Sequence, residues 1–203
     1  MKRRLFTAAL AAVLLSCTFT AGVAAADTTG YTLLVPNMKG TPYVQHIWLN
    51  PNSYGRNALQ SLLPTLGAEL ASASLGFDIK YVGYGTEPGS VGRITVSSVS
   101  SCASGILGYT PVAIGRYPNG DIYITHADVK ICPAAFNGID TLKETLYHEM
   151  GHAMGLGHYN YPYDGYYQMM YWVRDWASDY RTGDRHGLRN LAIWSSRLRH
   201  GGT

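Results

Sequence analysis

Apolar residues recur with helical spacing over residues 57–74, in the first half of the chain. They lie three or four positions apart and so share one face of a helix. The residues of this pattern are Leu59, Leu62, Leu63, Leu66, Leu70 and Ala73. The pattern predicts a helix with one apolar face, and Pro64 predicts a kink in it or a later start.

Five short runs rich in β-branched and aromatic residues predict strands. They cover residues 31–35, 46–49, 77–82, 93–98 and 121–125, with turns containing glycine or proline between them. Further along, Thr141-Leu-Lys-Glu144 has the form of a capping box and predicts the start of a second helix. Asp184 predicts the N-cap of a third helix. Strands followed by helices predict an α+β domain.

The first 26 residues have the organisation of a secretory signal. Three basic residues follow Met1, and an apolar run over residues 5–15 leads to a small-residue stretch that ends at Ala26. We expect cleavage after Ala26, which leaves residues 27–203 as one secreted domain. The apolar run is short for a bilayer, so no permanent membrane span is expected. One alternative remains, because Leu14-Leu-Ser-Cys17 loosely resembles a lipoprotein processing site that would anchor the protein through Cys17.

The charge balance changes once the signal is removed. The chain has 16 basic and 13 acidic residues, and three of the basic ones, Lys2, Arg3 and Arg4, belong to the signal. Thirteen of each sign remain, so the mature chain has a formal charge near zero. Nothing in this balance favours a nucleic acid or an anionic membrane as a partner.

Two cysteines remain in the mature chain, Cys102 and Cys132. An even number of cysteines in a chain bound for an oxidising compartment predicts a disulfide. Two free thiols acting as metal ligands are a weaker alternative, because the pair lacks C-x-x-C spacing.

Residues 148–158 carry three histidines at metal-binding spacing. His148 and His152 are four positions apart, so on a helix both imidazoles project from one face. Gly155 can adopt the left-handed conformation that ends a helix, which lets His158 return to the same ion. Three imidazoles leave one zinc position open, as in catalytic sites. Glu149 is placed beside that position and is the candidate general base.

The motif from His148 to His158 resembles the extended zinc-binding motif of the metzincin peptidases. The chain is most similar to small secreted bacterial matrixin-like members, with snapalysin-like or serralysin-like proteases as alternatives. The resemblance implies a zincin domain with a twisted, mostly parallel sheet, an antiparallel edge strand and an active-site helix. A C-terminal subdomain would hold a methionine turn and the final helix. One catalytic Zn²⁺ is implied, whereas Ca²⁺, frequent in the clan, cannot be assigned to particular residues.

The sequence Gln168-Met-Met-Tyr171 resembles the methionine turn below the metal. In the matrixin register Met170 is the turn methionine. In the serralysin register Met169 takes this place, and Tyr171 would join the metal or contact the transition state. We favour Met170, because residues 183–191 resemble the C-terminal helix of bacterial matrixin-like domains. Alternatively, both methionines only fill the core.

In metzincins the strand before the active-site helix lies at the sheet edge and pairs with an extended substrate. By order in the chain, the resemblance assigns this role to Asp121, Ile122, Tyr123, Ile124 and Thr125. Tyr171, Trp172 and Val173 would help to wall the specificity pocket, or alternatively would only pack in the core. A cluster of tyrosines at positions 159–167 predicts either a substrate-binding rim or side chains that fix an irregular loop.

The function expected from these patterns is that of a secreted, monomeric zinc endopeptidase. It would hydrolyse internal bonds of protein or peptide substrates by zinc-activated water, with Glu149 as base. The competing interpretation is a catalytically silent, zinc-stabilised module that binds a surface protein or cell-wall polymer. Glu149 argues against this module, because a purely structural zinc site has no use for a carboxylate there.

Overall fold

The computed structural model describes residues 29–35, 38–39, 44–85, 91–171 and 178–199. The predicted signal, its cleavage site and Cys17 lie outside these residues, as do Trp172 and Val173. Within the described part of the chain, no helix has both the length and the apolar character needed to cross a membrane.

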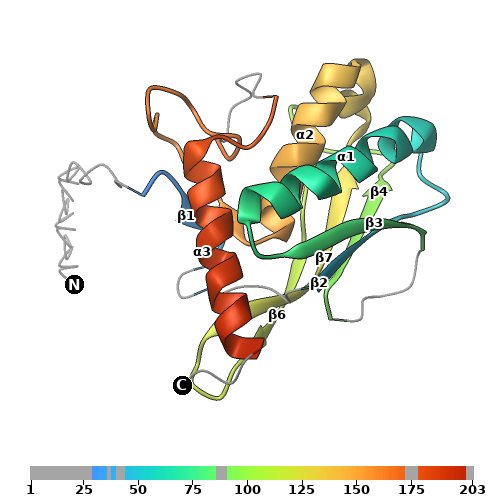
Figure 1. The fold of residues 1–203 in the computed structure, drawn as a ribbon. Helices are drawn as coiled ribbons and strands as arrows, with labels where there is room; N and C mark the ends of the chain where they lie inside the picture. The colour runs from blue at the N-terminus through green and yellow to red at the C-terminus, as the bar shows by residue number, and fades with distance from the viewer. Residues whose placement is uncertain (1–28, 36–37, 40–43, 86–90, 172–177, 200–203) are drawn as a thin grey trace, which may run out of the picture.

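A six-stranded, mostly parallel sheet forms the centre of the fold (Figure 1). Four parallel strands occur in the order β3 (Asp78–Tyr84), β2 (Val44–Leu49), β4 (Arg93–Ser98) and β7 (Ile122–Ile131). Two short strands then pair antiparallel with β7, namely β5 (Gly108–Tyr109) and β6 (Val112–Arg116). The expected α+β class, parallel sheet and antiparallel edge are therefore present.

The antiparallel edge consists of β5 and β6, and the expectation that residues 121–125 form it is wrong. Asp121 precedes β7, and Ile122, Tyr123, Ile124 and Thr125 begin that strand. On one side the segment pairs with β6, in the register Ile124 opposite Ile114. On the other side Ile122 bridges to Met38, and the carbonyl of Thr125 accepts the Gly92 N–H at 2.9 Å. Both sides of the segment are occupied, so an added strand cannot pair there.

Three α-helices accompany the sheet in the described residues: α1 (Arg56–Ser74), α2 (Ile139–Ala153) and α3 (Thr182–Arg199). Helix α1 packs on β2 and β3, α2 packs on β7, and the two helices touch on the same face of the sheet (Figure 1). Helix α3 packs against α1. The core lies between these layers and includes the predicted apolar face of α1, where Leu59, Leu63, Leu66 and Leu70 are fully buried. Helix α1 continues through Pro64.

Both predicted helix caps are wrong. Helix α2 begins at Ile139, where the Leu142 N–H donates to the Gly138 carbonyl at 3.0 Å and no side chain caps the end. Thr141 lies inside this helix, and its carbonyl accepts the Thr145 hydroxyl at 2.7 Å. Helix α3 begins at Thr182, and Asp184 lies in its first turn. The Asp184 carboxylate accepts the Arg181 N–H three residues before it and also the N–H groups of Met169 and Met170, which belong to a segment that a local pattern does not reveal.

Cys102 and Cys132 form the predicted disulfide, with Cα atoms 5.9 Å apart. The bond ties the segment before β5 to the residue that follows β7. Beside it, the Cys132 N–H donates to the Leu107 carbonyl at 2.8 Å. Cross-linking residues 30 positions apart stabilises the folded chain by about 3 to 4 kcal/mol on the chain-entropy model. The antiparallel edge is therefore covalently attached to the centre of the sheet.

Candidate metal centre

The imidazoles of His148, His152 and His158 converge. Their candidate ligand atoms all lie within 4.8 Å of one another. The Nε2 atom of His158 is 3.1 Å from that of His148 and 3.2 Å from that of His152. Zinc–nitrogen bonds of about 2.1 Å at tetrahedral angles place ligand nitrogens about 3.4 Å apart. The three side chains could hold one metal ion, and no second cluster of this kind occurs among the described residues.

The turn after α2 brings His158 back to the helix. Gly155 has φ of +105°, as predicted, and a β-carbon there would lie 2.6 Å from Met38 Sδ. The next residues form β8 (Leu156–Gly157), which pairs antiparallel with β1 (Thr32–Leu33). The Thr32 hydroxyl then donates to the His158 carbonyl at 2.6 Å. The third histidine is thus positioned by the N-terminal segment, far away in the sequence.

Backbone carbonyls determine the tautomers of the two helical histidines. The Nδ1 of His148 donates to the Met169 carbonyl at 2.9 Å, and that of His152 donates to the Leu156 carbonyl at 2.8 Å. A carbonyl can only accept, so each Nδ1 carries the hydrogen and each Nε2 presents a free lone pair. Burial lowers the pKa of His148 to about 4 and that of His152 to about 3. Both rings are therefore neutral at pH 7, the state that binds a metal.

Glu149 lies on α2 and is only 5% exposed. The Thr110 hydroxyl, between β5 and β6, is 2.7 Å from Glu149 Oε2 and donates to it. Gly108 of β5 lies so close that a β-carbon there would be 2.8 Å from Glu149 Cγ. Burial raises the pKa of Glu149 to about 7, against the opposing effect of the Thr110 hydrogen bond. Such a carboxylate can take up a proton near neutral pH. Neither Gly108 nor Thr110 was expected from the sequence, because β5 carries only two residues and no apolar pattern.

The methionine segment forms a turn beneath the helical histidines. The Tyr171 N–H donates to the Gln168 carbonyl at 3.0 Å and closes it. Met170 is 1% exposed, and a β-carbon on Gly151 of α2 would collide with its Sδ. Met169 instead contributes its carbonyl to His148. Met170 is therefore the methionine whose side chain packs against the helix between the two histidines.

The ring of Tyr171 stacks on that of Tyr167, with centroids 4.1 Å apart. A role for Tyr171 as metal ligand or transition-state contact stays a prediction. Of the other loop tyrosines, Tyr159 is buried in the domain, whereas Tyr161 and Tyr166 are exposed. The ring of Tyr159 therefore attaches the loop to the domain, whereas the rings of Tyr161 and Tyr166 face the solvent.

Asp184 connects α3 to the methionine turn. Its carboxylate accepts the backbone N–H groups of Met169 at 2.7 Å, Met170 at 3.2 Å and Arg181 at 3.0 Å. The Gly183 N–H also donates to the Gln168 side chain at 2.8 Å. Burial raises the pKa of Asp184 to about 6, although the three hydrogen bonds oppose this shift. Asp184 thus supports the turn whose carbonyl orients His148.

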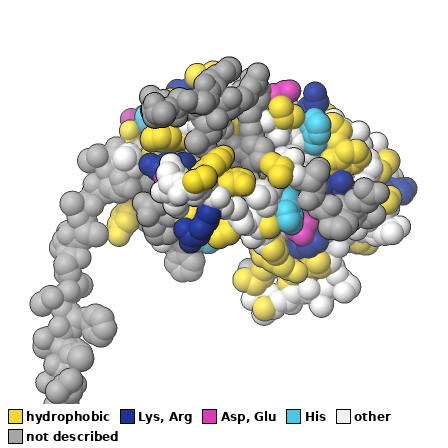
Figure 2. Space-filling model, turned by 90° about the horizontal axis from the view of Figure 1, so that it is seen from below, with side chains coloured by type: hydrophobic (Ala, Val, Ile, Leu, Met, Phe, Trp, Pro, Cys, Tyr) yellow, Lys and Arg dark blue, Asp and Glu magenta, His cyan; other side chains and the backbone are white. Residues whose placement is uncertain are grey.

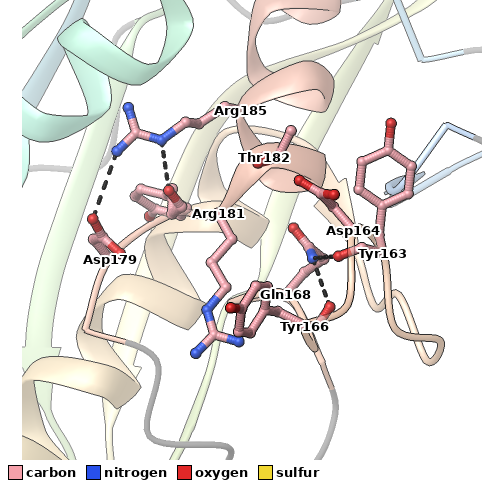
Figure 3. Close-up of a pocket in the computed structure, with 9 residues that line it drawn as sticks. Tyr163, Asp164, Tyr166, Gln168, Asp179, Arg181, Thr182 and Arg185 are labelled. Carbon is pink, nitrogen blue, oxygen red and sulfur yellow. Dashed lines mark hydrogen bonds and ion pairs between the residues drawn. The ribbon is translucent and has the colours of Figure 1, made fainter.

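A cavity of about 360 Å³ lies beside this turn (Figure 3). Its polar groups largely pair with one another. Gln168 Nε2 donates to the carbonyls of Tyr163 and Tyr166, and Arg185 forms an ion pair of 3.7 Å with Asp179. The loop is joined to α3 by the Gly183 N–H, which donates to Gln168 Oε1 at 2.8 Å. None of the three histidines lines the cavity.

Charged side chains are dispersed on the face of the molecule shown in Figure 2. The coloured Lys and Arg side chains lie apart from one another among hydrophobic and uncharged ones.

Comparison with known proteins assigns no family. No protein-family model matches the chain, and no curated protein matches it. Among the described residues, the features that bear on function are the mixed sheet, the helix beside it and three histidines that could bind a metal.

Proposed function

We propose that this chain is a zinc-dependent endopeptidase of the metzincin type. His148, His152 and His158 are the metal ligands, Glu149 is the general base and Met170 is the methionine of the turn. The observation that carries the proposal is the convergence of the three imidazoles, two of them on α2, together with the buried Glu149 between those two in the same helix. A purely structural site would have no use for that carboxylate.

The donor set fits zinc. Three imidazoles whose ligand atoms lie within 4.8 Å of one another could supply three of four tetrahedral positions and leave one open. The carbonyls that accept from Nδ1 of His148 and His152 keep these rings oriented and raise their basicity. A zinc ion bound there would lower the pKa of a water molecule and polarise a peptide carbonyl.

Glu149 performs the proton transfers. It takes a proton from the attacking water as the new C–O bond forms at the peptide carbon. It then delivers that proton to the amide nitrogen as the C–N bond breaks, so the products are a carboxylic acid and an amine. Burial raises the pKa of Glu149 above its ordinary value, which favours uptake of the proton that it later delivers to the amine. Burial keeps bulk water from competing for the carboxylate.

The substrate-binding edge is the segment formed by β5 and β6 in place of residues 121–125. Both strands pair with β7 alone among the described strands, so their other side is available to an extended peptide. Tyr109 and Ile114 on this edge are 44% and 48% exposed. A peptide added here would pass Glu149, because Gly108 of β5 contacts it. Main-chain pairing favours unfolded or extended protein segments as substrates.

The domain is proposed to act outside the cell. The disulfide and the signal-like first 26 residues support export. The intact mass of the mature protein distinguishes cleavage after Ala26 from lipid attachment at Cys17.

The test is hydrolysis of casein and of internally quenched peptides by the zinc-loaded protein. We expect activity that a chelator removes and added zinc restores. The Glu149→Gln variant should retain zinc and lose activity by about 1,000-fold or more, given the size of general-base effects. If the wild type and this variant both hold zinc and are equally inert, the chain is a zinc-stabilised binding module and the proposal fails.

A further inference from the structure

The edge strand does more than border the site. We propose that Thr110 is a positioning residue for Glu149, whose hydroxyl fixes one carboxylate oxygen so that the other is directed to the reaction. This inference rests on the proposed peptidase function, since it assigns a role within the same site.

The hydroxyl contacts Glu149 at two points. Thr110 Oγ1 lies 2.7 Å from Glu149 Oε2 and 3.1 Å from the backbone carbonyl of the same residue. The two contacts fix the side chain of Glu149 relative to the backbone of the same residue on α2, which limits its rotamers. No described residue donates a hydrogen bond to Oε1. Thr110 therefore occupies Oε2 and leaves Oε1 to exchange protons with substrate and water.

Thr110 is itself held rigidly. Tyr109 before it pairs with Lys130 of β7, and the carbonyl of Pro111 after it accepts the Asp128 N–H at 2.9 Å. The disulfide fastens the preceding segment to the end of β7. Threonine is also β-branched, which restricts its χ1 rotamer. The hydroxyl therefore has a defined place relative to α2.

Gly108 limits the carboxylate on a second side. A β-carbon at this position would lie 2.8 Å from Glu149 Cγ and 3.0 Å from Oε1. Gly108 does not have a positive φ, so the requirement is for space and not for an unusual backbone. The Thr110 hydroxyl donates a hydrogen bond to Oε2, and the absence of a side chain at Gly108 leaves space for Oε1. Together the two residues form a cradle for the base on the strand proposed to bind substrate.

A purely structural Thr110 would only tie the edge strand to α2. Two substitutions separate the interpretations. Thr110→Val keeps the shape and removes the hydroxyl, whereas Thr110→Ser keeps the hydroxyl and removes a methyl group. If Thr110 positions Glu149, kcat should fall by about 10- to 100-fold in Thr110→Val with little change in KM, as expected for a lost hydrogen bond to a charged group. Thr110→Ser should stay within about threefold of the wild type.

Two readouts do not depend on turnover. Zinc affinity, measured by competition with a chromophoric chelator, should be unchanged in Thr110→Val, because the three ligands are untouched. The carboxylate stretching bands of Glu149, identified by difference from Glu149→Gln, should shift in Thr110→Val and not in Thr110→Ser. Should valine prevent folding, Thr110→Ala provides the same comparison.

The outcomes separate this inference from the proposed function. An active wild type, an inactive Glu149→Gln and a Thr110→Val variant with wild-type kcat and unshifted bands would overturn the role of Thr110 alone. Equal losses in Thr110→Ser and Thr110→Val would also overturn it. A wild type that hydrolyses no peptide, with the Glu149 bands still shifted in Thr110→Val, would reject the peptidase and retain the Thr110 contact.

Discussion

The Nδ1 of His148 donates a hydrogen bond of 2.9 Å to the backbone carbonyl of Met169, 21 residues further along the chain. This contact places the turn that carries Met169 and Met170 below the candidate metal ligands and fixes the tautomer of one of them. The turn in turn depends on Asp184, which accepts the N–H groups of Met169 and Met170. Helix α3, the turn and the histidine therefore form one supporting chain of contacts.

Replacing Asp184 should weaken the fold and the site together. In Asp184→Ala three backbone N–H groups lose their acceptor, two of them in fully buried positions. We expect a loss on the order of 3 kcal/mol in the free energy of unfolding and weaker zinc binding. Urea unfolding and chelator competition measure the two effects. The control is Asp179→Ala, which removes only an exposed ion pair with Arg185 and should cost less than about 1 kcal/mol.

Stability should also depend on the ionisation of Asp184. Burial raises its pKa from 3.8 to about 6 in the folded chain, so the folded state binds the proton more tightly than the unfolded state. Its contribution to stability is complete below about pH 4 and is lost as the pH rises through about 6, for a total of about 3 kcal/mol. Unfolding of the wild type and of Asp184→Asn is compared between pH 4 and 7.5. A difference between them that stays flat, or grows in favour of the wild type with rising pH, would contradict the shift.

Gly151 should tolerate no side chain. A β-carbon at this position of α2 collides with Met170 Sδ, so Gly151→Ala must shift the buried Met170 side chain, the turn that carries it or the helix. We expect a destabilisation of about 1 to 3 kcal/mol, typical of overpacking. The melting temperature and zinc affinity are the measurements. Combining Gly151→Ala with Met170→Ala should recover part of the loss, and no recovery would show that the contact is not the cause.

Loss of the disulfide should affect the antiparallel edge first. In the double variant Cys102→Ser and Cys132→Ser, the free energy of unfolding should be about 3 kcal/mol lower than in the wild type. Because the bond anchors the segment before β5, hydrogen exchange at residues 103–110 should rise more than exchange in α1. Uniform protection across both regions would mean that the edge holds its place without the bond.

Local patterns predicted some of these elements and could not predict others. Helix α1 and strand β4 follow from periodicity, and the histidines from helical spacing plus one glycine with positive φ. Strand β5 has only two residues, and β6 follows a proline and contains Gly115, which weakens its strand pattern. Because the sequence did not predict these two strands, residues 121–125 were expected at the edge of the sheet, which is not their position.

Long-range contacts account for the remaining differences. Thr32 holds His158 across 126 positions, and Thr110 reaches Glu149 across 39. The sequence around Thr32, Thr110 or Asp184 carries no signal for these partners, because each contact arises only when distant segments pack. Aspartate is common at helix N-caps, so the residue type of Asp184 predicted that role. The same carboxylate also suits the role that it has, as acceptor for the backbone N–H groups of the methionine turn.

The most direct test of the central claim is the zinc content of the purified chain, measured by elemental analysis. We predict one zinc ion per chain in the wild type and in His186→Ala, a control histidine in α3 outside the cluster. We predict a large loss of zinc in each of His148→Ala, His152→Ala and His158→Ala. A wild type that retains no zinc, or three variants that keep it as well as the control does, would contradict the account.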